Sequence, residues 1–288
     1  MRQPLSGPVA IAVALLLSPS AGTGLAEAAA WEQRLGLELL LNEGYYSANW
    51  SGDERTSGSL TAALDHLAAR QFASPLRFEH GLALAFGQQV ARRDSAAGGG
   101  WETSKSEDKI RLDEALRFTL GYWVDPIVST QLTSRFTDGR DSTRTYWLNP
   151  LQLLEMAGVG RRFYADSTRT LTSELGAAAR QLFDHSAPGT VADAGVSWRS
   201  ELRTIVFSRN ADYTTRLVVY KPLFALGGGA EIGSWPQLDW EHELSARFNK
   251  ALSGKVYVRL LYDENVTEDV RLKQTVGLGL SLAWPAAE

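Results

Sequence analysis

Cysteine is absent from this chain of 288 residues. Its absence excludes disulfides, thiolate metal sites and cysteine nucleophiles, and also the lipid-bearing cysteine of an exported lipoprotein. The chain has no large excess of charge of either sign, with 33 acidic and 29 basic residues and a net charge of −4. This balance gives no indication of a basic surface for nucleic acid. We expect no cofactor and no metal, because neither Asp138–Asp141 nor Asp263–Asn265 has the spacing of a calcium loop.

Long apolar runs are missing as well. No stretch of about 18 apolar residues occurs, which excludes a membrane protein built from helices. The N-terminus has a lone basic residue, Arg2, then a short apolar core, Val9–Leu17, and then small residues. This order is typical of a secretory signal peptide. We predict a cleaved signal peptide at 1–26, with Ala30 as the alternative cleavage site, and one domain at 27–288.

What is present is alternation of period two, which predicts strands, whereas helical spacing is scarce. The last strand shows it clearly, since Val276, Leu278, Leu280 and Leu282 alternate with glycine and serine. About twelve such stretches occur, at 35–41, 60–70, 76–86, 110–122, 128–136, 157–164, 170–183, 196–206, 213–220, 238–248, 256–262 and 270–284. We expect Pro222 to end pairing of the ninth, because proline donates no ladder hydrogen bond.

The connections alternate between long and short. The long polar ones are 43–57, 89–107, 137–152, 184–192 and 224–236, and the short ones include 71–75, 124–126, 165–169 and 249–254. Short turns on one rim and long loops on the other are typical of outer-membrane barrels. The sequence therefore predicts an all-β fold, a closed antiparallel transmembrane β-barrel of about 12 strands. Its expected location is the outer membrane of a bacterium with a Gram-negative-type envelope.

The direction of the two faces follows from the aromatic and the small residues. Aromatic residues such as Tyr122, Trp123, Phe163 and Tyr164 gather near strand ends, as at a headgroup boundary. Glycine and alanine are frequent on the polar face, where inward side chains are crowded. We therefore assign the apolar face to lipid and the charged face to the lumen. A secreted sandwich with its charges in water is the alternative.

The predicted lumen carries charges of both signs. The residues are Arg77, Glu79, Arg111, Asp113, Arg117, Arg135, Arg199, Glu201, Arg203, Asp239, Glu241, Glu243, Arg259, Arg271 and Lys273. Because opposite charges at cross-strand distance tend to pair, we expect a narrow or occluded bore. The strand of Glu241 is expected to lie between those of Arg216 and Arg259. Glu32 and Glu38 are expected to meet Arg271 and Lys273 where the first and last strands close the barrel.

Several short motifs follow one another along the mature chain: Asn49–Gly52, Lys105–Lys109, Phe136 with Gly139, Asn149–Pro150 and Gly158–Gly160. In these motifs the chain resembles a family of uncharacterised bacterial outer-membrane β-barrel proteins, a domain of unknown function. The resemblance implies the location and the fold, and it carries no activity. Trp284 resembles the terminal aromatic that the barrel-insertion machinery recognises. That machinery and outer-membrane lipid are thus the expected partners.

Three function classes stay open. The first is a narrow solute or lipid-handling channel that uses the charged lumen as its path. The second is a structural or surface-interaction barrel acting through its extracellular loops, with Tyr45–Tyr46 and Tyr146–Trp147 as contact aromatics. The third is a hydrolase using His185 or His242, but no nucleophile is visibly paired with either. We therefore expect no enzyme and name no catalytic residue.

Overall fold

The computed structural model describes residues 30–46, 57–93, 100–140, 144–186, 190–207, 211–227, 232–249 and 251–284. The predicted signal peptide at 1–26 and the motif Asn49–Gly52 lie outside these residues. Within the described part of the chain, no helix is long and apolar enough to cross a membrane. The strands are β1 (Glu32–Tyr46), β2 (Ser57–Ala73), β3 (Leu76–Arg93), β4 (Gly100–Phe118), β5 (Asp125–Ser134), β6 (Thr137–Asp138), β7 (Tyr146–Trp147), β8 (Leu151–Ala165), β9 (Arg169–Phe183), β10 (Thr190–Val206), β11 (Ala211–Gly227), β12 (Gln237–Arg247), β13 (Leu252–Asp263) and β14 (Thr267–Trp284).

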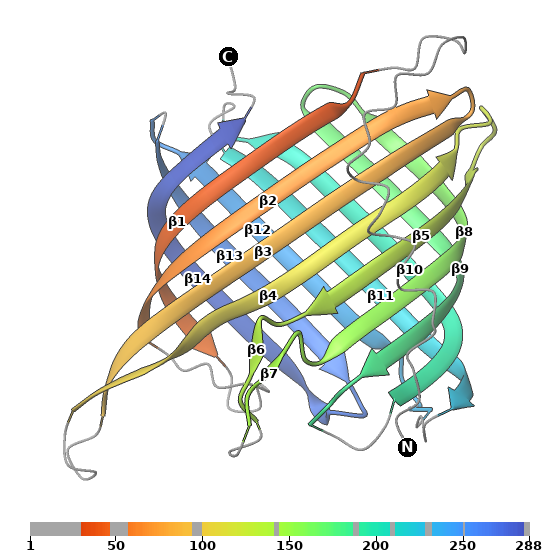
Figure 1. Ribbon diagram of the computed structural model, residues 1–288. Helices are drawn as coiled ribbons and strands as arrows, with labels where there is room; N and C mark the ends of the chain where they lie inside the picture. Colours follow the sequence, from red (N-terminus) through yellow and green to blue (C-terminus); the bar gives the residue numbers. More distant parts are fainter. Residues whose placement is uncertain are drawn as a thin grey trace, which may run out of the picture.

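Twelve of these strands form one closed antiparallel barrel, in the order β1-β14-β13-β12-β11-β10-β9-β8-β5-β4-β3-β2. The predicted fold class is thereby confirmed. β6 and β7 pair only with each other, within the connection between β5 and β8. The strands are strongly tilted, and β1 begins on the same rim at which β14 ends (Figure 1). The tight turn at 74–75 lies on this rim too, which we call the turn rim; the opposite one is the loop rim.

The barrel exposes its aliphatic side chains and buries its charged ones, the reverse of a protein folded in water. Leu278 and Leu282 are 57% and 65% exposed, whereas Arg117 and Asp193 are 3% and 0% exposed. The sheet closes on itself in a single layer, which excludes the secreted sandwich. Inside, a small apolar cluster centred on Ile127 and Met156 is surrounded by polar residues.

Exposed aromatic side chains form a girdle along the turn rim, with a smaller group at the loop rim. The turn-rim members are Trp31, Phe72, Phe118, Tyr122, Trp123, Phe163, Tyr164, Phe207, Phe248 and Trp284, and those at the loop rim are Trp147, Phe224 and Trp235. Between them, outward indoles donate hydrogen bonds to neighbouring strands, as Trp198 does to Ser173. An aliphatic band between aromatic girdles is the surface that a bilayer requires.

Two strands are longer than the sequence pattern indicates. The segment 89–107 was expected to be a loop, but β3 continues to Arg93 and β4 begins at Gly100. This prediction was wrong because residues 100–107 carry few apolar side chains. A strand that extends beyond the lipid band needs no apolar outer face, so alternation weakens there. At its other end β4 stops at Phe118, four residues before the predicted Tyr122.

The expectation for Pro222 was also wrong. β11 continues through Pro222 to Gly227, and Pro222 lies opposite Gly195 where the β10–β11 register shifts. Proline is tolerated at such an irregularity because one ladder hydrogen bond is already missing there. The approach of the two strands requires glycine at 195, since a Cβ on Gly195 would collide with the carbonyl oxygen of Lys221.

Candidate functional site: the charged bore

One strand supplies most of the charges that cross the bore. Glu107, Lys109, Arg111, Asp113 and Arg117 of β4 alternate with outward residues, so the pleat turns all five toward the lumen. Their partners lie on strands that are not neighbours of β4. The pairs are Glu107 with Lys273 on β14 at 2.5 Å, Lys109 and Arg111 with Glu241 on β12 at 3.1 and 3.0 Å, Asp113 with Arg216 on β11 at 3.0 Å and Arg199 on β10 at 3.8 Å, and Arg117 with Glu174 on β9 at 2.8 Å.

These ion pairs span the bore, because β4 and β12 face each other across it. Going round the closed sheet, β5, β8, β9, β10 and β11 separate the two strands on one side, and β3, β2, β1, β14 and β13 separate them on the other. Glu241 accepts both Lys109 and Arg111 and has Arg259 at 3.5 Å. We call this set of cross-bore ion pairs from β4 the partition.

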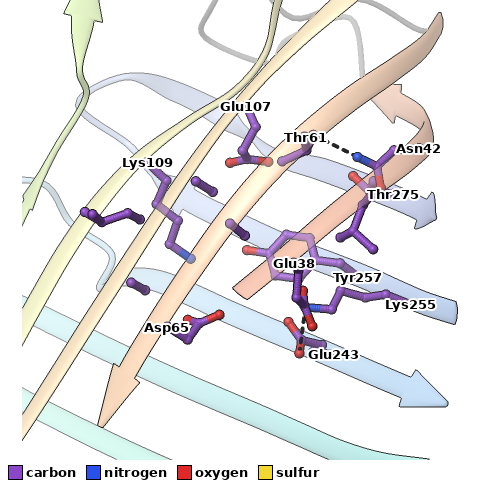
Figure 2. A pocket seen from close by; sticks show the side chains of 15 residues that line it. Glu38, Asn42, Thr61, Asp65, Glu107, Lys109, Glu243, Lys255, Tyr257 and Thr275 are labelled. Atoms are coloured by element: carbon purple, nitrogen blue, oxygen red, sulfur yellow. Dashed lines mark hydrogen bonds and ion pairs between the residues drawn. The ribbon is translucent and has the colours of Figure 1, made fainter. Parts of the chain in front are cut away.

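On one side of the partition lies the first cavity, which is open to solvent; its empty space, including open solvent, is about 680 Å³. It is lined by β1, β2 and β3, with β4, β12, β13 and β14 completing it. Figure 2 shows Asp65, Lys109, Lys255 and Tyr257 converging on it from different strands. Lys255 lies 2.5 Å from Glu38 and 3.2 Å from Glu243. The lining therefore contains two kinds of charged group: lysines that already have ion-pair partners, and further carboxylates.

The second cavity lies among β5, β8, β9 and β11–β14, and its empty space, including open solvent, is about 740 Å³. Arg180 forms a 2.6 Å ion pair with the fully buried Asp193, which also accepts the Tyr220 hydroxyl. Arg259 donates two hydrogen bonds to Asp239, both 2.8 Å long. Three arginines and two aspartates line this cavity, whereas two lysines and four carboxylates line the first.

The predicted lumen residues are distributed over both cavities, the partition and the rims. Arg111, Asp113, Arg117, Arg199, Glu241 and Lys273 form the partition; Asp239, Arg259 and Arg271 line the second cavity; and Glu243 lines the first. As expected, Glu241 lies opposite Arg216 on β11 and Arg259 on β13. Arg77 and Glu79 pair near the turn rim, Glu201 and Arg203 pair within β10, and Arg135 lies just beyond β5.

The expected pairing at the seam between β1 and β14 was wrong. Lys273 is opposite Tyr46 in the register, and Glu38 is opposite Ser281. Glu38 instead pairs with Lys255 on β13, and Glu32 with Arg77 on β3. The stagger between the first and last strands places their charges at different heights, and this stagger is set by closure of the barrel and not by either strand alone.

Several charged side chains inside the barrel are not predicted by the sequence pattern. The alternation pattern misses Glu107 and Lys109, because residues 89–107 have the polar composition of a loop and the predicted strand begins only at 110. Glu174, Arg180 and Asp193 lie on β9 and β10, where weak alternation among alanines hid the inner register. Glu174 and Arg180 do share the inner register of β9 with Gly176 and Ala178, and that even spacing is the signal that could have found them.

A second polar network joins two loop segments at the loop rim. Asn149 donates to Asp138 at 2.7 Å, to Asp184 at 3.0 Å and to Ser186 at 2.8 Å. Arg140 bridges Asp138 and Asp184 with ion pairs of 2.7 and 2.8 Å. Burial alone would raise the pKa of Asp138, but the hydrogen bonds from Arg140, Asn149 and Ser186 outweigh it and hold that pKa well below its usual value. We call this network the loop latch.

The histidines do not assemble a hydrolytic site in the described residues. His80 and Glu114 face lipid together, 3.5 Å apart, which explains an acidic residue in the apolar register of β4. His242 Nδ1 and the Tyr213 hydroxyl share a hydrogen bond of 2.8 Å, and the backbone N–H of His185 donates a hydrogen bond to the side-chain oxygen of Asn149. Among the described residues, no group of three or more histidine, aspartate or glutamate side chains is placed to hold a metal ion.

Comparison with known proteins gives similarity of fold at low sequence identity. No family model matches the chain, and neither does any curated relative. An outer-membrane channel from Pseudomonas putida F1 is 15% identical, with 93% of this chain and 100% of that one covered and a TM-score of 0.44. The NanC porin is 9% identical, with 85% of this chain and 100% of that one covered and a TM-score of 0.43. The toluene transporter TbuX of Ralstonia pickettii is 8% identical, with 89% of this chain and 90% of that one covered and a TM-score of 0.34.

These similar structures are an outer-membrane channel, a porin and a toluene transporter. Similarity this low gives no information on the function of this chain. The bore therefore has to be interpreted from its own side chains.

Proposed function

We propose that this protein is a narrow channel of the bacterial outer membrane that conducts small polar solutes. The observation that carries this proposal is the partition. It divides a bore of twelve strands into two solvent-open cavities lined by charged side chains. A general porin needs an unobstructed aqueous lumen, whereas a selective channel confines its solute between fixed charges.

The placement in the membrane is part of the same proposal. The aliphatic band and the aromatic girdle support insertion into lipid. Export would use the signal peptide at 1–26, and the barrel-insertion machinery would recognise the last strand through Trp284. Under this proposal the charges do not catalyse a reaction; they select the solute.

A planar lipid bilayer tests the proposal. The refolded mature chain should give discrete single-channel steps that are small compared with those of a general porin. A preparation that migrates as a folded, heat-modifiable barrel yet never conducts would overturn the proposal. A large, unselective conductance would overturn the narrow path specifically.

A surface-interaction barrel is the second candidate, and the loop latch favours it. The latch fixes the segment that carries Trp147, a side chain 73% exposed at the loop rim. A rigid loop presenting an aromatic residue is typical of a contact surface. If this function holds, Trp147→Ala abolishes partner binding and leaves bilayer conductance unchanged. Tyr45 and Tyr46, the other predicted contact aromatics, end β1.

A further inference from the structure

The first cavity contains a carboxylate with no partner. Asp65 of β2 makes no hydrogen bond and no ion pair with any described residue, although it lies inside the barrel. The neighbouring lysines are committed elsewhere: Lys255 to Glu38 and Glu243, and Lys109 to Glu241 across the bore. Asp65 is therefore a carboxylate that no described cation contacts directly.

The other carboxylates of the cavity have cationic partners. Glu38 and Glu243 pair with Lys255, and Glu107 pairs with Lys273, so among the described lining residues Asp65 is the carboxylate that no cation contacts directly. Asp65 is exposed to this open cavity, so a cation that enters can pair with it without displacing a lysine. Among the described residues, the buried Oγ1 of Thr275 has no hydrogen-bond partner, and Tyr257 also lines the cavity.

Small side chains give this space its volume. Ala63 on β2 and Ala83 and Ala85 on β3 form one wall, with Leu40 beside them. Asp65 lies in this same wall, opposite Ala83 in the β2–β3 register, so an occupant at Asp65 also meets methyl groups. A metal ion would suit neither the methyl wall nor the ligand set, since the described residues include no metal-binding group of three.

We propose that the first cavity binds a small organic cation, a primary ammonium with a short alkyl chain, anchored by Asp65. The ammonium donates to the carboxylate of Asp65 and to the oxygens of Thr275 and Tyr257, and the alkyl chain lies against Ala83. This assignment deepens the proposed channel function and rests on it, because it names the class of solute that the channel passes. The second cavity, with its arginines, does not share this preference.

Binding is measured apart from conduction, by isothermal titration calorimetry on the detergent-refolded mature chain. The probes are n-butylammonium, butyrate and n-butanol, which share a chain and differ in charge. We expect butylammonium to bind and the other two not to. Asp65→Asn should weaken butylammonium binding about tenfold or more, as expected for the loss of a charge-assisted hydrogen bond.

Two variants control for folding and for net charge. Ala83→Leu keeps every charge and fills the cavity, so it should abolish binding while the barrel stays heat-modifiable. Asp269→Asn makes the same chemical change as Asp65→Asn at an exposed site outside the cavity, and binding should be unchanged. Equal binding of butylammonium and butanol, or butylammonium binding that Asp65→Asn leaves unaltered, would overturn the assignment.

The bilayer separates this inference from the function on which it rests. Conduction that butylammonium does not impede, with no heat of binding, would refute the cation site and leave the channel intact. Heat of binding in a barrel that never conducts would support the cation site and refute the channel. Concentration-dependent block of the current, lost in Asp65→Asn, would support both.

Discussion

Removing the carboxylate at the centre of the partition should change both the stability and the conductance of the barrel. Glu241 receives charge-assisted hydrogen bonds from Lys109 and Arg111 and lies beside Arg259. The Glu241 and Arg111 side chains are 12% and 19% exposed, so solvent screens their pairing only partly. Glu241→Gln leaves three cations without their shared counter-charge.

The cost follows from the burial of these groups. Breaking a buried ion pair by removing one partner costs about 3–5 kcal/mol, and a bore that admits water favours the lower end, about 3 kcal/mol. A double-mutant cycle with Arg111→Gln should give a coupling energy of about 1–2 kcal/mol. The measurement is urea unfolding of the barrel refolded in lipid vesicles.

Conductance gives an independent readout of the same change. Glu241→Gln releases Lys109 and Arg111 from the partition and leaves the path with more positive charge. Single-channel current should therefore rise, and selectivity should move toward anions. Glu201→Gln is the matched control, because Glu201 pairs with the half-exposed Arg203 of its own strand and should cost less than about 1 kcal/mol. Strictly additive unfolding energies together with unchanged current would refute the partition as the element that narrows the bore.

Three further changes test the wall, the lipid face and the loop latch. Gly195→Val should prevent β10–β11 pairing and abolish the heat-modifiable band on gels, whereas Gly58→Val, with nothing within 4 Å of its Cβ, should still fold. Leu278→Arg on the lipid face should destabilise the barrel by about 2–4 kcal/mol in urea unfolding, and Val266→Arg, in the turn between β13 and β14, by much less. Asp138→Asn should cost the latch about 2 kcal/mol and speed proteolysis between 140 and 186 about 30-fold at pH 7. The pKa of folded Asp138 lies below the ordinary 3.8. The latch should therefore keep its full stabilisation above about pH 4 and lose it as the pH falls through the lowered pKa. In strong acid, the wild-type protein and the Asp138→Asn variant should be proteolysed at the same rate.

Much of the barrel could be predicted from local pattern. Alternation located all twelve strands of the barrel, because one side chain in two must face lipid and the pleat fixes that period. The alternation gives no prediction at positions where side chains do not have to face lipid or where strand pairing is irregular. Residues 100–107 of β4 extend beyond the lipid band, and Pro222 lies at an irregularity where the usual rule against proline is relaxed. Both errors arose at positions where the lipid face or the hydrogen-bond ladder imposes no constraint on the sequence.

The candidate site was only partly accessible in the same way. The inward register of Arg111, Asp113 and Glu241 could be read directly, and so could the mixture of signs that narrows the bore. Asp65 carried no signal, since a single aspartate in a weakly alternating segment gives no indication that it lacks a partner. Its importance comes from neighbours on β4, β12 and β13.

The sequence by itself determined the fold class and which side chains face lipid, because both follow from the alternation of residues along each strand. Only the tertiary structure decided which charges meet. The partner of Arg117 is 57 residues away, that of Arg111 is 130 and that of Lys273 is 166. These pairs depend on the stagger at which the sheet closes, which places β4 opposite β12 and offsets the charges of β1 from those of β14. A period of two is a property of each strand, whereas the stagger is a property of the whole ring.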